Sequence, residues 1–82
     1  MLSEQTRRVI IETVAEHLSL TVNDVTEDSK IVDHLGADSL DIVEISAKFE
    51  DMYGIEIADS DIMKIKTISD IFDYVQKNTN IS

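Results

Sequence analysis

Apolar residues recur at helical spacing near the start of the chain, with charged residues between them. Ser3 stands just before this stretch, where its hydroxyl could cap the first free backbone N–H groups of a helix. The apolar positions that keep the three-and-four spacing are Ile10, Ile11, Val14 and Leu18. This pattern predicts an amphipathic helix over about residues 4–18.

The stretch from Ser39 to Tyr53 contains neither glycine nor proline and also has one apolar face. That face is formed by Ile42, Ile45, Phe49 and Tyr53. Asp38 can cap the helix at its start, and Gly54 suits the left-handed residue that commonly ends one. We therefore expect a second helix over 39–53.

Two further helices are predicted in the last third of the chain. Thr67 followed three residues later by Asp70 is typical of a helix start, and the buried stripe of that helix would be Ile68, Ile71, Phe72 and Val75. Before it, two acidic residues precede two basic ones, which suggests a short helix whose charges match its dipole: Asp59, Asp61, Lys64 and Lys66.

The segment 19–38 loses any regular period and mixes polar residues with scattered apolar anchors. These anchors are Val22, Val25, Ile31, Val32 and Leu35. We read it as a long loop that packs down at intervals, and loops of this length are more often functional than idle. No stretch is convincing as a strand. The expected fold is all-α, a small four-helix bundle with three main helices, one short helix and a long loop between the first and second helices.

Length and composition narrow the possibilities further. Eighty-two residues suffice for one modest core, so residues 1–82 are expected to form a single domain. The chain has no cysteine, so any thiol chemistry would need an added group. It contains no apolar run near the length of a membrane span, and its first residues lack a signal pattern. We expect a soluble, monomeric protein of the cytoplasm, with an organelle as the alternative location.

The negative charge is concentrated in the middle of the chain. Residues 24–61 carry twelve of the seventeen acidic residues and only two lysines, a local net charge of −10 that equals the total. Such a field repels phosphate backbones and anionic lipids and attracts surfaces rich in arginine and lysine. Nucleic acid and membranes are therefore excluded as expected partners.

Ser39 lies at the loop-to-helix junction, a position where its hydroxyl could carry a chemical modification. Its hydroxyl should be exposed where free backbone N–H groups and the positive end of the helix dipole would stabilise an attached anion. The simpler interpretation is that Ser39 or Asp38 only caps the helix, which is the usual role of such residues at helix starts.

The sequence around Ser39 closely resembles the phosphopantetheine attachment segment of acyl carrier proteins. The residues that carry this resemblance are Leu35-Gly36-Ala37-Asp38-Ser39-Leu40-Asp41, followed by Val43-Glu44. The similarity continues through Glu50, Glu56-Ile57 and Lys64-Ile65 to Thr67-Ile68, over nearly the whole chain. It implies a carrier domain, with no enzymatic activity of its own.

The resemblance implies a 4'-phosphopantetheine arm attached by a phosphodiester to Ser39, framed by Asp38 and Leu40. A phosphopantetheinyl transferase would add the arm from coenzyme A, and its terminal thiol would carry acyl groups as thioesters between enzymes of fatty-acid or related lipid or polyketide synthesis. The absence of cysteine is consistent with this role, because no thiol of the protein would compete with the arm for the acyl group.

The resemblance also assigns roles to two groups of residues. Acyl-transferring and chain-elongating enzymes with basic docking patches would bind the acidic side chains of Asp38, Asp41, Glu44, Asp51, Glu56 and Asp59. The acyl chain would lie between the helices against Ile42, Ile45, Phe49, Ile57, Ile62 and Ile65. The alternatives are a solvated acidic surface and an ordinary core.

Several residues differ from the usual fatty-acid carrier. Ile42 and Ile62 stand where the family often has Thr and Ala, so we expect a shallower acyl cavity. Other residues that differ from the usual family sequence change the surface on which partner enzymes would dock, among them His34, Lys48, Met52 and Ala58. They indicate a specialised carrier serving a dedicated pathway, with neutral drift as the alternative explanation.

Other chemistries fit the sequence poorly. His17 and His34 lie far apart and lack the spacing of zinc ligands, so we expect both at the surface and no metal site. Ser39 with His34 lacks the nucleophile-elbow motif of a serine hydrolase. Two rivals stay open: a peptidyl or aminoacyl carrier of the same fold, and an unmodified acidic module that binds a basic partner.

Overall fold

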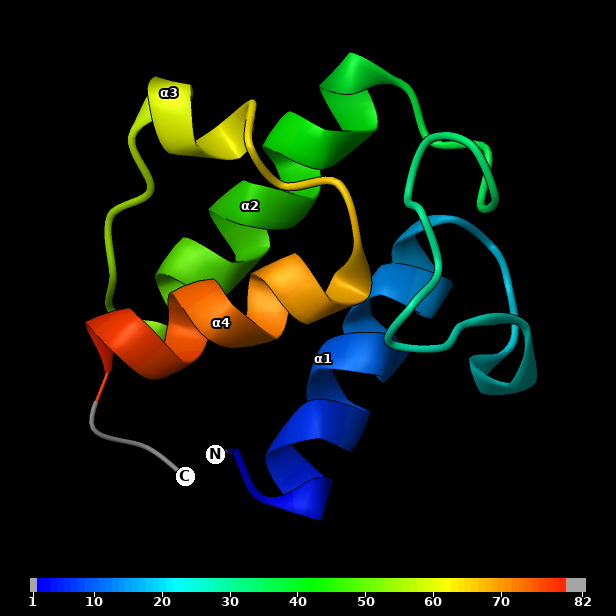
Figure 1. The fold of residues 1–82 in the computed structure, drawn as a ribbon, viewed down its shortest axis with the longest axis horizontal. Helices are drawn as coiled ribbons and strands as arrows, with labels where there is room; N and C mark the ends of the chain where they lie inside the picture. Colours follow the sequence, from blue (N-terminus) through cyan, green and yellow to red (C-terminus); the bar gives the residue numbers. More distant parts are fainter. Residues whose placement is uncertain (1, 80–82) are drawn as a thin grey trace.

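The computed structural model describes residues 2–79. Along that part of the chain the helices are α1 (Glu4–His17), a single 3-10 turn η1 (Val22–Asp24), α2 (Ser39–Tyr53), α3 (Asp59–Ile62) and α4 (Ile68–Asn78) (Figure 1). No strand occurs between residues 2 and 79. The predicted all-α bundle of three long helices and one short helix is confirmed.

The long helices begin and end at residues that the sequence indicates. Ser3 Oγ accepts a hydrogen bond of 3.1 Å from the backbone N–H of Thr6 at the start of α1. At α4, Thr67 Oγ1 accepts from the N–H of Asp70 and the Asp70 carboxylate accepts from the N–H of Thr67, at 3.2 and 3.0 Å. Gly54 ends α2 with a φ of 63°, a conformation that favours glycine.

The core lies where α1, α2 and α4 meet, and the long loop contributes to it as well. α1 contacts both α2 and α4. Buried side chains come from α1 (Ile10, Val14), from α2 (Ile45, Phe49), from α4 (Ile71, Val75) and from the loop (Val25, Ile31, Ala37). Removing these apolar surfaces from water is the main term that stabilises so small a domain.

The long loop between α1 and α2 packs against the bundle through only some of its expected anchors. Val25 and Ile31 are buried and Leu35 is half-buried, as expected. Val22 and Val32 are exposed, which contradicts the prediction. An isolated antiparallel bridge between Lys30 and Thr67 fixes the loop beside the start of α4, as Figure 1 shows. Next to the bridge, the Ile31 N–H donates a hydrogen bond of 2.9 Å to the Lys66 carbonyl, and the chain then turns over residues 31–35, with Ile31 buried and Val32 exposed.

The short helix α3 ends earlier than its charge pattern suggests. It covers only Asp59–Ile62, so Lys64 and Lys66 lie beyond its end and the expected match of lysines to its dipole is wrong. Contacts from other elements hold it instead, since the Tyr74 hydroxyl on α4 donates a hydrogen bond to Asp61 Oδ2 at 3.2 Å.

None of the helices between residues 2 and 79 is both long and apolar enough to cross a membrane.

Candidate functional site

Ser39 is the first residue of α2 and its side chain is exposed. None of the hydrogen bonds within residues 2–79 involves its hydroxyl. The backbone N–H groups of the first helical turn and the positive end of the helix dipole lie at the same place. A free hydroxyl is thus presented to solvent where an attached phosphate would be stabilised.

The residues before Ser39 place it at this point. Gly36 adopts a φ of 77°, a left-handed conformation that a side chain would strain, and Ala37 is buried and anchors the loop against the core. Asp38 then caps α2, because its Oδ1 accepts the N–H of Asp41 at 2.8 Å. The turn, anchor and cap together fix where the helix begins, while Leu40 remains 61% exposed beside the serine.

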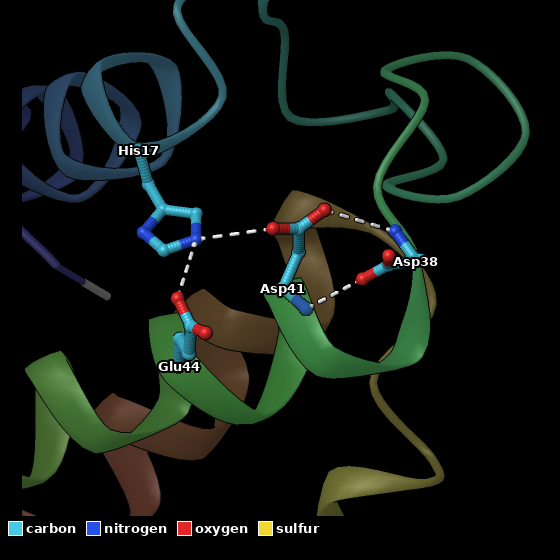
Figure 2. Close-up of polar contacts among 4 residues, drawn as sticks. All are labelled: His17, Asp38, Asp41 and Glu44. Atoms are coloured by element: carbon cyan, nitrogen blue, oxygen red, sulfur yellow. Dashed lines mark hydrogen bonds and ion pairs between the residues drawn. The ribbon is translucent and has the colours of Figure 1, made fainter.

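Asp38 and Asp41 form a reciprocal capping box at the start of α2. Asp41 Oδ2 accepts the backbone N–H of Asp38 at 3.1 Å, while Asp38 caps the N–H of Asp41 in return (Figure 2). The hydrogen bond from the Asp38 backbone lowers the pKa of the Asp41 carboxyl, with a smaller contribution from His17. Asp41 is therefore ionised and held in one orientation.

His17 lies across from these acids, at the last residue of α1. Its Nε2 is 3.3 Å from Asp41 Oδ1 and 3.4 Å from Glu44 Oε2, and Figure 2 shows the ring between the two helices. Its side chain is only 11% exposed, so the prediction of a surface position for His17 is wrong. His34 is exposed as expected, and its Nδ1 accepts the backbone N–H of Lys30 at 3.0 Å.

The predicted docking acids lie in two separate places: Asp38, Asp41 and Glu44 are at the start of α2, whereas Asp51 is in its last turn, Glu56 follows it and Asp59 begins α3. Asp38, Asp51, Glu56 and Asp59 are exposed, and the Glu44 side chain is 51% exposed, whereas Asp41 is half-buried. The structure therefore brings Asp38, Asp41 and Glu44 together near Ser39 on the first turns of α2.

A small cavity lies in the interior of the bundle. Five of the six residues predicted for the acyl pocket line it: Ile42, Ile45, Phe49, Ile57 and Ile65. Its volume is about 10 Å³, which is close to the least that can hold one water molecule. The interior is thus closed in this conformation.

A larger, open groove of about 630 Å³ lies beside Ser39. The sixth predicted residue, Ile62, lines this groove and not the interior cavity, whereas Ile42 and Ile65 line both. The groove also has lining residues that sequence reasoning missed, namely Lys30, Val32, Asp33, Val43, Met63 and Lys66. The loop residues among them come to the groove through the Lys30–Thr67 bridge, which has no local sequence signal.

Comparison with known proteins supports a family assignment. The family model for the phosphopantetheine attachment site matches residues 8–75. The chain is 42% identical to the acyl carrier protein of Thermotoga maritima over 78% of its length and 79% of the relative's. It is 44% identical to that of Wolinella succinogenes, over 84% of its length and 91% of the relative's.

A solved structure agrees with this assignment. The structure of the acyl carrier protein from Enterococcus faecalis superposes with a TM-score of 0.79 at 32% identity, covering 96% of this chain and all of the other. The sequence match and the structural match both span nearly the whole chain, and the matched segment includes the exposed serine. The chain therefore belongs to the acyl carrier protein family and tethers acyl intermediates on a covalently attached 4'-phosphopantetheine.

Proposed function

We propose that the Ser39 hydroxyl of this chain is the attachment point of the phosphopantetheine arm. The observation that carries the proposal is the exposed hydroxyl, without a hydrogen bond within residues 2–79, at the first residue of α2 and beside an open groove. A transferase can reach such a hydroxyl without unfolding the chain. When bound, the arm supplies the thiol that the cysteine-free chain lacks.

The neighbouring residues prepare this position for a phosphodiester. Asp38 caps α2 and so holds its first turn in place, and the helix dipole favours the negative charge of the phosphate. The Asp38 carboxylate is itself engaged by the N–H of Asp41, which limits its repulsion of the phosphate. Leu40, exposed beside Ser39, offers an apolar contact to an enzyme that approaches the arm.

Acyl chains pass from the arm into the bundle along the groove, in this proposal. Ile42 and Ile65 form the wall that the open groove shares with the interior cavity. An acyl chain enters when these side chains move, because the closed interior holds no more than about one water molecule. Ile62 lines the route to this wall, and Ile45, Phe49 and Ile57 lie beyond it.

Partner enzymes dock on the acidic surface around α2, in this proposal. The candidates are Asp38, Asp41, Glu44, Asp51, Glu56 and Asp59, which would pair with arginine and lysine residues of a phosphopantetheinyl transferase and of acyl-transferring and chain-elongating enzymes. Exposed ion pairs of this kind are individually weak and sensitive to salt. They would speed association and still let the carrier leave quickly.

The proposal extends to the domain organisation, location, pathway and partners of the protein. Residues 1–82 act as a single, monomeric carrier domain in the cytoplasm, serve fatty-acid synthesis or a related lipid or polyketide pathway, and catalyse no reaction. Neither nucleic acid nor a membrane is a partner, because the charge of −10 opposes both.

The attachment site is tested by incubating the protein with coenzyme A and a phosphopantetheinyl transferase and measuring its intact mass. The wild type and Ser60→Ala, which removes another exposed serine at the start of a helix, should each gain one arm. Ser39→Ala should gain none. Equal modification of Ser39→Ala would show that the arm is attached elsewhere.

A further inference from the structure

His17, Asp41 and Glu44 bring three metal-binding side chains to one point between α1 and α2. One donor atom from each lies within 4.8 Å of the other two. His17 comes from the end of α1 and the two acids from the first two turns of α2, 24 residues or more along the chain. As Figure 2 shows, both carboxylates point toward the same imidazole nitrogen.

We propose that these three side chains form a binding site for a divalent transition metal, with zinc as the expected occupant. Zinc binds imidazole nitrogen and carboxylate oxygen at about 2.0–2.2 Å, so two tetrahedral ligands lie about 3.3–3.6 Å apart. His17 Nε2 is 3.3 Å from the Asp41 oxygen and 3.4 Å from the Glu44 oxygen. Small side-chain movements would admit the ion between them.

The fold orients two of the three ligands before any metal binds. The His17 ring is mostly buried between the helices. Asp41 uses Oδ2 to accept the Asp38 N–H and presents Oδ1 to His17. Such outer contacts fix the orientation of metal ligands and strengthen binding. Glu44 is half-exposed and can adjust, and the exposed side of the site can admit water as the fourth ligand.

The imidazole distinguishes this site from the rest of the acidic surface. Magnesium and calcium prefer oxygen ligands alone, whereas zinc and its neighbours in the first transition row favour imidazole nitrogen. Two carboxylates in a segment with a net charge of −10 attract any divalent cation, and His17 then selects among the cations. Because Asp41 and Glu44 are also proposed docking acids, a bound ion would compete with basic partners.

The proposal is tested by isothermal titration calorimetry of the metal-stripped protein, without the arm, with zinc chloride and magnesium chloride at about pH 7.5, above the ordinary pKa of imidazole. The variants are His17→Gln, Glu44→Gln and, as a matched control, His34→Gln on the exposed loop histidine. Circular dichroism verifies that each variant is folded. Glu44→Gln keeps the test decisive if His17→Gln is unstable, because Glu44 is half-exposed.

We expect the wild type and His34→Gln to bind zinc more tightly than magnesium, with equal affinity for zinc. In His17→Gln and Glu44→Gln the zinc affinity should fall about tenfold or more, since loss of even an outer-sphere partner costs about 10–100-fold. One equivalent of zinc should also shift the imidazole nitrogen resonances of His17. Zinc affinity within about twofold in all variants, or an unshifted His17 resonance, would overturn the proposal.

Discussion

The side chain of Ile42, together with that of Ile65, lines both the open groove beside Ser39 and the closed interior of the bundle. Replacing Ile42 by alanine would remove part of the wall that these spaces share and join the groove to the interior. The substitution should therefore lower the stability of the protein without cargo and increase the stability gained from a long acyl chain.

The cost can be estimated from the atoms removed. Ile42→Ala deletes three carbons, worth about 0.8 kcal/mol each when fully buried, or about 2.4 kcal/mol in total. Ile42 is only half-buried, which reduces the expected loss to about 1.5 kcal/mol, below the usual range for fully buried sites. At about 4–8 °C per kcal/mol for a domain of this size, the melting temperature should fall by about 6–12 °C.

The assay compares melting temperatures of the arm-bearing protein with free thiol and with acyl chains of increasing length. The gain in melting temperature with chain length should be larger in Ile42→Ala than in the wild type. Val43→Ala is the matched control, because Val43 lines the groove but not the interior cavity and is exposed. Its response to chain length should equal that of the wild type. Equal gains in Ile42→Ala and wild type would refute the idea that Ile42 limits entry.

Three further predictions concern stability. The hydrogen bond from the Asp38 N–H is the main cause of the lowered pKa of the Asp41 carboxyl in the folded protein. The ionised Asp41 therefore stabilises the fold above the pKa that the carboxyl has in the unfolded chain, and this stabilisation is lost as the pH falls through the lower pKa of the folded state. The melting temperature of the wild type should thus fall more between about pH 5 and pH 3 than that of Asp41→Asn, and parallel curves would contradict this. Thr67→Ala removes the α4 cap and should cost about 1 kcal/mol in chemical denaturation, whereas Ser69→Ala, without a side-chain hydrogen bond within residues 2–79, should cost less. Added salt or magnesium should raise the melting temperature by screening the acidic segment, and indifference to both would exclude strong repulsion there.

The helices could be predicted from the sequence because local signals determine them. Thr67 with Asp70 and the apolar stripe of α4 all lie within one short segment and agree with each other. The start of α2 is equally local, since the left-handed Gly36, the Asp38 cap and Ser39 all lie within four consecutive residues. Such agreement between neighbouring signals makes an element predictable.

The missed features depend on contacts between distant residues. His17 has the sequence context of a surface histidine, and only the packing of α1 on α2 brings it against Asp41 and Glu44. The position of the long loop beside the start of α4 likewise depends on the bridge between Lys30 and Thr67. Contacts between residues so far apart produce no periodic pattern or motif in a single sequence, so only the three-dimensional structure reveals them.

The claim that the chain carries acyl groups as thioesters on its arm is tested most directly by incubating the unmodified protein with octanoyl-coenzyme A and a phosphopantetheinyl transferase. The intact mass of the protein is then measured before and after treatment with neutral hydroxylamine. We predict the gain of one octanoyl-phosphopantetheine group, from which hydroxylamine removes the acyl group and leaves the arm, because the link is a thioester. No gain in mass, with a transferase that modifies another carrier protein in parallel, would contradict the claim that this chain carries acyl groups on a phosphopantetheine arm.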